Sequence, residues 1–126
     1  MRRAAAGFTL VEVIIVVVII GLLATIIIPR FSSARERALL TTMQSDLRNL
    51  LTHEEARKLD SGSYATAFPP SVWRPSTGVT GPTITITPDG WTASVGHQST
   101  GRTCAIFVGS TSLAPASVEG VPTCTP

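Results

Sequence analysis

The apolar residues of this chain are concentrated near its beginning. Residues 8–28 read FTLVEVIIVVVIIGLLATIII, and Glu12 is the one charged residue among them. As a helix these 21 residues would extend about 31 Å, roughly the hydrocarbon thickness of a bilayer. The run is apolar on every side and too long for a strand. It therefore predicts a helix surrounded by lipid or protein, despite its many β-branched residues.

Beyond Pro29 the pattern becomes amphipathic. Apolar residues recur at helical spacing and predict a single apolar stripe: Leu40, Met43, Leu47, Leu50 and Leu51. Charged residues occupy the opposite face: Arg35, Glu36, Arg37, Asp46, Arg48, Arg57 and Lys58. Pro29 is the one strong breaker, and a membrane helix tolerates a proline with a bend. We therefore predict one bent helix over about residues 8–59, with Gly62 suited to its C-terminal cap.

The rest of the chain is rich in Ser, Thr, Gly and Pro. A loop is predicted over residues 64–80. Three strands are predicted at 83–87, 91–97 and 104–109, with a turn at Pro88-Asp89-Gly90 and a Gly/Ser-rich loop before the last strand. The tail from Ser110 to Pro126 reads as irregular. The fold class is therefore α+β, with the second half of the helix packed on a small antiparallel sheet of three to four strands.

This reading divides the chain into consecutive parts. They are a short leader (1–7), an apolar helix (8–30) and a globular domain (31–126). Within the domain we expect the amphipathic helix half (31–60), a loop (61–82), and the sheet with a C-terminal loop (83–126).

Charge gives little reason to expect a nucleic-acid partner. There are ten Lys and Arg against eight Asp and Glu, and Arg2 and Arg3 account for the difference. No basic stripe remains in the rest of the chain.

No catalytic motif is complete. His53-Glu54-Glu55 begins like the H-E-x-x-H zinc motif, but residue 57 is arginine, so a solvated helix face is predicted instead. His97 has no acidic partner in its neighbourhood and reads as a strand-end or loop residue. Neither a Walker loop nor a dinucleotide fingerprint is present. We therefore expect no enzyme, no metal and no cofactor.

Trp73, Trp91 and Phe107 could form a sugar-binding surface, but we expect them to pack the sheet on the helix stripe.

Cys104 and Cys124 are the two cysteines. Their spacing does not fit a C-x-x-C redox or zinc motif. Two cysteines in a small exported domain more often pair with each other, and the alternative is two unrelated buried thiols.

The N-terminus carries the most informative motif. A basic leader ending in Gly7 is followed by Phe8-Thr9-Leu10-Val11-Glu12 and the apolar run. This resembles the prepilin signal of the bacterial type IV pilin and type II secretion pseudopilin families, closely over residues 1–30 and more loosely along the helix. The resemblance implies cleavage between Gly7 and Phe8 by prepilin peptidase and N-methylation of Phe8.

The resemblance also assigns a role to Glu12. In an assembled filament its carboxylate would pair with the Phe8 amine of a neighbouring subunit and set the register between subunits. Physical chemistry agrees, because an isolated carboxylate in an apolar segment is costly and is a functional candidate. A tolerated interfacial glutamate is the alternative.

Gly21 and Pro29 fall where members of this family carry helix-weakening residues, and the resemblance implies a kink or local unwinding there. The alternatives are close helix packing at Gly21 and a simple kink at Pro29.

The resemblance further implies a disulfide between Cys104 and Cys124. Asp89 and Glu119 are too few for the calcium site of major pseudopilins.

The function implied is a structural subunit that polymerises into a surface filament for adhesion, twitching motility or DNA uptake. Its partners would be copies of itself, other pilins, prepilin peptidase, an inner-membrane assembly platform and a motor ATPase. Nucleic acid would be met only through the assembled filament. The subunit would be stored in the inner membrane with a cytoplasmic N-terminus.

Two alternatives remain. One is a type II secretion pseudopilin, which forms a periplasmic pseudopilus. The other is a secreted or anchored binding module with an ordinary signal peptide, for which Ser32-Ser33-Ala34 could serve as the cleavage site. An apolar core longer than the usual 7–15 residues argues against the second.

Overall fold

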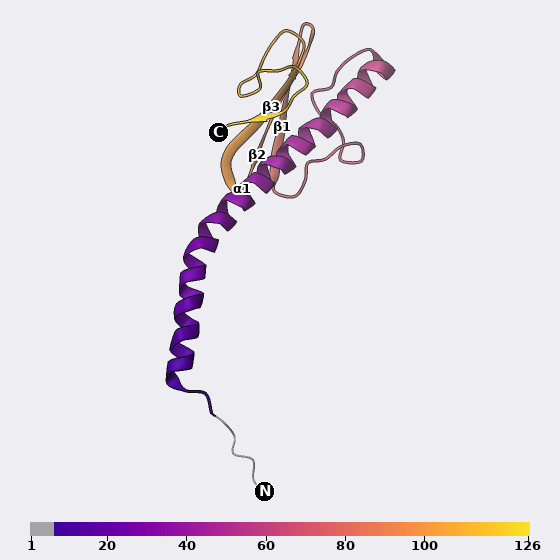
Figure 1. The fold of residues 1–126 in the computed structure, drawn as a ribbon. Helices are drawn as coiled ribbons and strands as arrows, with labels where there is room; N and C mark the ends of the chain where they lie inside the picture. The colour runs from indigo at the N-terminus through magenta and orange to yellow at the C-terminus, as the bar shows by residue number, and fades with distance from the viewer. Residues whose placement is uncertain (1–6) are drawn as a thin grey trace. The chain divides into compact units, whose positions relative to one another are not determined.

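The computed structural model describes residues 7–126, which form two compact units. The first ends at Arg35, and the second is Glu36–Pro126. A single helix, α1, runs over Leu10–Ser61 and contributes to both (Figure 1). Apart from Gly7, the predicted leader lies outside the described residues.

The first unit is dominated by the apolar part of α1. It contains an 18-residue window with a mean hydropathy of 3.2, none of which is buried, so this helix is long and apolar enough to cross a membrane. Its polar Thr25 hydroxyl donates to the Leu22 carbonyl at 2.7 Å and is thereby satisfied within the helix. Apolar surface this extensive needs lipid or a protein partner to cover it.

The predicted helix is confirmed, with its bounds shifted by two residues at each end. Gly62 follows the last helical residue with a φ of 75°, and its N–H donates to the Lys58 carbonyl at 2.9 Å. This left-handed cap is the one predicted for Gly62. Pro29 lies inside the helix. The bend predicted there stays a prediction.

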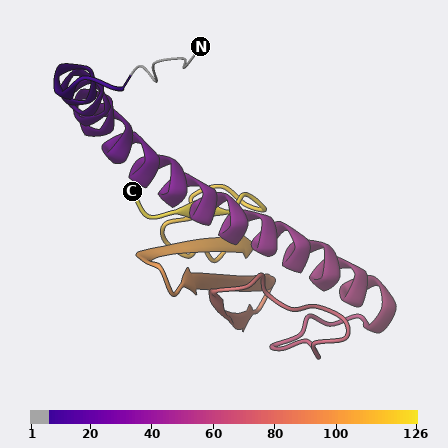
Figure 2. The ribbon, with the colours of Figure 1, turned by 90° about the horizontal axis from the view of Figure 1, so that it is seen from below.

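The sheet has four antiparallel strands in the order β1-β2-β3-β4. The strands are β1 (Val79–Thr87), β2 (Gly90–His97), β3 (Thr100–Val108) and β4 (Thr123–Cys124). In the second unit the sheet lies along one side of α1 (Figure 2). The predicted α+β class and antiparallel sheet are confirmed.

Two predicted strand starts are wrong, and one strand was not predicted. β1 begins at Val79, inside the predicted loop, because a bulge between Thr80 and Thr83 lets the strand continue through Gly81 and Pro82. Gly81 takes a φ of 100°, and β1 is an edge strand, where a proline is tolerated. β3 begins at Thr100, so the predicted Gly/Ser-rich loop is only a short connection. The tail is not wholly irregular, because Thr123 and Cys124 pair with β3 as β4.

The core lies on both faces of the sheet. The face toward α1 packs against the predicted helix stripe, and Trp73 and Trp91 join it as expected. Phe107 does not. It lies on the opposite face with Ala105, Ala116 and Leu113, because side chains alternate along β3 and Phe107 follows Ile106 of the helix-side core. The buried residues of the helix-side core are Met43, Leu47, Leu50, Trp73, Val79, Trp91, Ala93, Val95, Cys104 and Ile106.

Two acidic residues predicted on solvated helix faces are buried instead. Asp46 is 4% exposed and accepts hydrogen bonds at 2.8 Å from both the N–H and the hydroxyl of Ser76. Glu54 is fully buried and accepts from the Ala65 N–H at 2.9 Å. Both carboxylates therefore fasten the connection after α1 to the helix, a role that the helical pattern did not suggest.

Candidate functional site

The start of α1 is organised by a reciprocal contact between Thr9 and Glu12. The Thr9 N–H and hydroxyl both donate to Glu12 Oε2 at 2.9 Å, and the Glu12 N–H donates to the Thr9 hydroxyl oxygen at 3.2 Å. Thr9 is the N-cap and Glu12 is the third helical residue, so the pair forms a capping box. The T-x-x-E spacing carries this signal in the sequence, but the prediction for this segment did not use it.

The capping box leaves part of Glu12 available. Both contacts use Oε2, and Oε1 accepts no hydrogen bond from any residue in the described range 7–126. One oxygen is thus held by Thr9, and the residue as a whole is exposed. Such an arrangement can accept a cation from another molecule without first uncapping the helix.

The predicted cleavage residues lie just before this helix. Gly7 and Phe8 have no regular secondary structure, and Phe8 is 81% exposed. A side chain added at Gly7 would meet no atom of the described residues within 4 Å. A protease could therefore reach this peptide bond without unwinding α1. Cleavage and methylation themselves stay predictions.

Gly21 lies inside α1, and a Cβ built on it would also meet nothing within 4 Å. Nothing among residues 7–126 therefore requires glycine there. The predicted roles of Gly21 and Pro29 in unwinding stay predictions that concern the assembled state.

The two cysteines form a disulfide, as the resemblance implied. Cys104 of β3 and Cys124 of β4 are bonded and lie opposite each other in the sheet register. The chain end is held further by Arg102, which donates to the Thr125 carbonyl at 3.3 Å and pairs with Glu36 of α1 at 2.7 Å. Arg102 thereby links β3, the C-terminal tail and α1 within the second unit.

Asp89 and Glu119 hold the loop that follows β3. Asp89 accepts from the Ser110 N–H and Glu119 from the Gly109 N–H, each at 2.7 Å. The hydrogen bonds from Ser110 lower the pKa of Asp89. Within residues 7–126 no group of three or more His, Cys, Asp and Glu side chains is placed to hold a metal ion. These two carboxylates act as loop caps.

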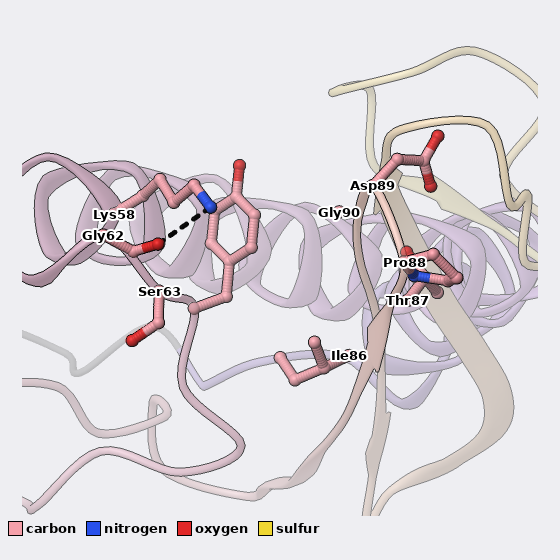
Figure 3. Close-up of a pocket in the computed structure, with 9 residues that line it drawn as sticks. Lys58, Gly62, Ser63, Ile86, Thr87, Pro88, Asp89 and Gly90 are labelled. Carbon is pink, nitrogen blue, oxygen red and sulfur yellow. Dashed lines mark hydrogen bonds between the residues drawn. The ribbon is translucent and has the colours of Figure 1, made fainter.

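A pocket of about 270 Å³ lies between the last turn of α1 and the β1–β2 turn (Figure 3). Lys58 reaches over the Tyr64 ring, 5.0 Å from its centroid, and donates to the Gly62 carbonyl at 3.0 Å. The Lys58 ammonium group is therefore already used to cap the C-terminal end of α1.

Burial of Glu54 makes a testable contribution to stability. Desolvation raises the pKa of Glu54, and the hydrogen bond from Ala65 opposes this only in part. A carboxyl whose folded-state pKa is raised stabilises the fold most at low pH, and this contribution is lost as the pH rises through the folded-state pKa. Glu54→Gln, which keeps an acceptor for Ala65, should be more stable than the wild type at pH 7. The two should converge near pH 4.

Thermal unfolding followed by tryptophan fluorescence between pH 4 and pH 8 measures this difference, because Trp73 and Trp91 are buried near the helix. Glu55→Gln is the matched control, since Glu55 is the neighbouring carboxyl and is only partly buried. A constant offset between Glu54→Gln and the wild type at every pH would contradict the assignment.

Together these features define a class of protein. Its members have a long N-terminal helix whose first part is apolar and exposed, with a carboxylate in its first turn. The second part of that helix packs on a small antiparallel sheet closed by a disulfide. This is the architecture of pilin-like proteins.

Comparison with known proteins agrees. The family model of the prokaryotic N-terminal methylation motif matches residues 2–28. The type II secretion system core protein G of Pseudomonas aeruginosa is 36% identical over 63 residues, which are 50% of this chain and 44% of that protein. The type IV wide pilus major component PilA4 of Thermus thermophilus is 40% identical over 62 residues, 49% of this chain and 47% of that protein. Over about half of its length, the chain is therefore similar to a type II secretion core protein and to a type IV pilus component.

The similarity is limited in extent. The chain spans less than half the length of the curated relatives named above. No solved structure matches it significantly. The helix and the methylation motif fit a protein anchored in the inner membrane.

Proposed function

We propose that this protein is a structural subunit, and not an enzyme, that is stored in the inner membrane and polymerises into a helical filament of the type IV pilus class. One observation carries the proposal. The methylation motif over residues 2–28 leads directly into an exposed apolar helix whose first turn presents Glu12 with one unused oxygen. The processing motif, the apolar helix that a filament would bury and the Glu12 carboxylate that could pair with a neighbouring amine therefore occur in one segment.

In the proposed mechanism the same apolar helix surface is covered first by lipid and then by other subunits. In the membrane, lipid covers the exposed side chains between Phe8 and Ile28. In a filament, the corresponding helices of other subunits cover them. The burial is favourable in both environments, so the free energy that selects the filament comes from specific contacts rather than from leaving water. We propose that the Glu12 carboxylate with the Phe8 amine of a neighbour is such a contact.

The orientation follows from the proposed processing. Prepilin peptidase would cleave between Gly7 and Phe8 on the cytoplasmic side and expose the amine that becomes methylated. The second unit would then lie outside the inner membrane, where oxidising conditions preserve the disulfide. The inner-membrane assembly platform and the motor ATPase are proposed partners on the ground of the family.

A type II secretion pseudopilin is the second candidate, and the relative in Pseudomonas aeruginosa supports it. The two candidates share the chemistry of processing and assembly. They differ in where the filament ends: a surface pilus can be imaged on intact cells, whereas a pseudopilus stays in the periplasm.

The experiment that tests the proposal is mass spectrometry of the protein from its native host. We expect a mature chain that begins at N-methyl-Phe8 and is lighter by the two hydrogens of one disulfide. An N-terminus at Arg35 would instead indicate an ordinary signal peptide cut after Ser32-Ser33-Ala34. Protein that keeps Met1 in assembled material would also contradict the proposal.

A further inference from the structure

Positive charge collects where the apolar part of α1 ends. No charged residue occurs from Val13 to Pro29, and then Arg30 and Arg35 follow within the first unit. Both arginines are exposed. A flank of this sign is unexpected on the outer side of a membrane, because basic residues are enriched on the cytoplasmic side. The two arginines therefore need an explanation other than topology.

Neither arginine has an acidic partner among residues 7–126. Neither forms an ion pair with any acidic residue of the described range, and residues 1–6 contain no acid. Glu36 is the nearest acid in sequence, and its carboxylate is engaged by Arg102 at 2.7 Å. The guanidinium groups of Arg30 and Arg35 are thus left to bind an external anion.

The depth of these side chains matches one layer of the membrane. The uncharged stretch from Val13 to Pro29 extends about 26 Å as a helix, close to the hydrocarbon thickness of a bilayer. Arg30 and Arg35 differ by about 7.5 Å in axial position, which is comparable to the thickness of one headgroup layer. Guanidinium groups at this level meet phosphate oxygens, which they bind through two parallel hydrogen bonds.

We propose that Arg30 and Arg35 form a binding site for anionic phospholipid headgroups in the outer leaflet of the inner membrane. This inference rests on the proposed function for the orientation of the helix. Removal of the leader takes away Arg2 and Arg3, so Arg30 and Arg35 become the first two basic residues of the mature subunit. The lipid contact holds the stored subunit at a fixed depth until it is extracted into a filament.

The test uses the full chain reconstituted in vesicles of equimolar phosphatidylglycerol and phosphatidylcholine. Native mass spectrometry after gentle release measures the ratio of the two lipids that remain bound. We expect the wild type to prefer phosphatidylglycerol by about fivefold or more, since one arginine at an anionic surface contributes roughly that factor. In the double variant R30Q/R35Q this preference should fall by at least that factor. Arg2, Arg3 and Arg37 are common to both proteins, so they do not contribute to the difference.

The double variant R48Q/R57Q is the matched control, because it removes the same charge from exposed positions of the second unit. It should keep the wild-type preference. The inference is overturned if R30Q/R35Q keeps the preference, or if the control loses it equally.

Resistance to carbonate extraction reports separately whether the protein is inserted in the membrane. An inserted wild type without lipid preference contradicts this inference alone, whereas a wild type stripped by carbonate contradicts the membrane anchor of the proposed function as well.

Discussion

Glu12→Ala should abolish filament assembly while the cleaved subunit accumulates in the membrane. In the proposed filament the variant leaves the Phe8 amine of the neighbouring subunit buried without a counter-charge. Removing one partner of a buried ion pair costs about 3–5 kcal/mol, which corresponds to more than a hundredfold in the assembly equilibrium. The measurement is the amount of sheared surface filament compared with the amount of mature subunit in the membrane, both by immunoblot.

The capping box makes a sharper comparison possible. Glutamine also serves in a capping box, so Glu12→Gln keeps an acceptor for the Thr9 N–H while it removes the charge. Thr9→Val does the opposite, because it keeps the charge and removes the hydroxyl that caps the helix, at a cost of about 1 kcal/mol. We expect Glu12→Gln to fail in assembly and Thr9→Val to retain most of it. Normal filaments from Glu12→Gln would show that the carboxylate charge is not required.

Replacing both cysteines by alanine should lower the free energy of unfolding of the second unit by about 3 kcal/mol. The bond closes a loop with a sequence separation of 20 residues, and its main effect is to restrict the unfolded chain. For a domain of this size the melting temperature should fall by more than about 10 °C. Thermal unfolding followed by the fluorescence of Trp73 and Trp91 measures this loss.

Reductant provides the internal control for this prediction. The reduced wild type should melt close to the C104A/C124A variant, and the variant itself should not respond to reductant. Equal melting temperatures for the oxidised wild type and the variant would mean that β4 and the tail are held without the covalent bond.

The helix could be predicted from the sequence because its signals are local. An uninterrupted apolar run, a following apolar stripe and Gly62 at the end define α1 without reference to the rest of the fold. The N-terminal motif is equally local, and this is why Gly7, Phe8 and Glu12 could be proposed as functional residues from sequence. Their roles concern other molecules, however, and a single chain cannot test them.

The sequence was less informative where a residue depends on a distant partner. Asp46 and Glu54 fall among charged positions of the helical pattern, yet they are buried because Ser76 and Ala65 return to the helix and donate to them. β4 has only two residues, too short for any periodicity, and it exists through pairing with β3. Phe107 lies on the face away from α1, where the loop that contains Leu113 and Ala116 covers it, and that loop has no periodic pattern in the sequence.

The way the sheet ends has a further consequence for solubility. An edge strand offers unpaired N–H and C=O groups to other chains. The β1 edge is interrupted by the bulge at Gly81 and Pro82, which discourages such pairing. At the other edge, β4 covers β3 beside Cys104 and Ala105, and a covalent bond holds it there. Under the proposed function, formation of that bond after export should therefore also protect newly made subunits from edge-to-edge aggregation at β3.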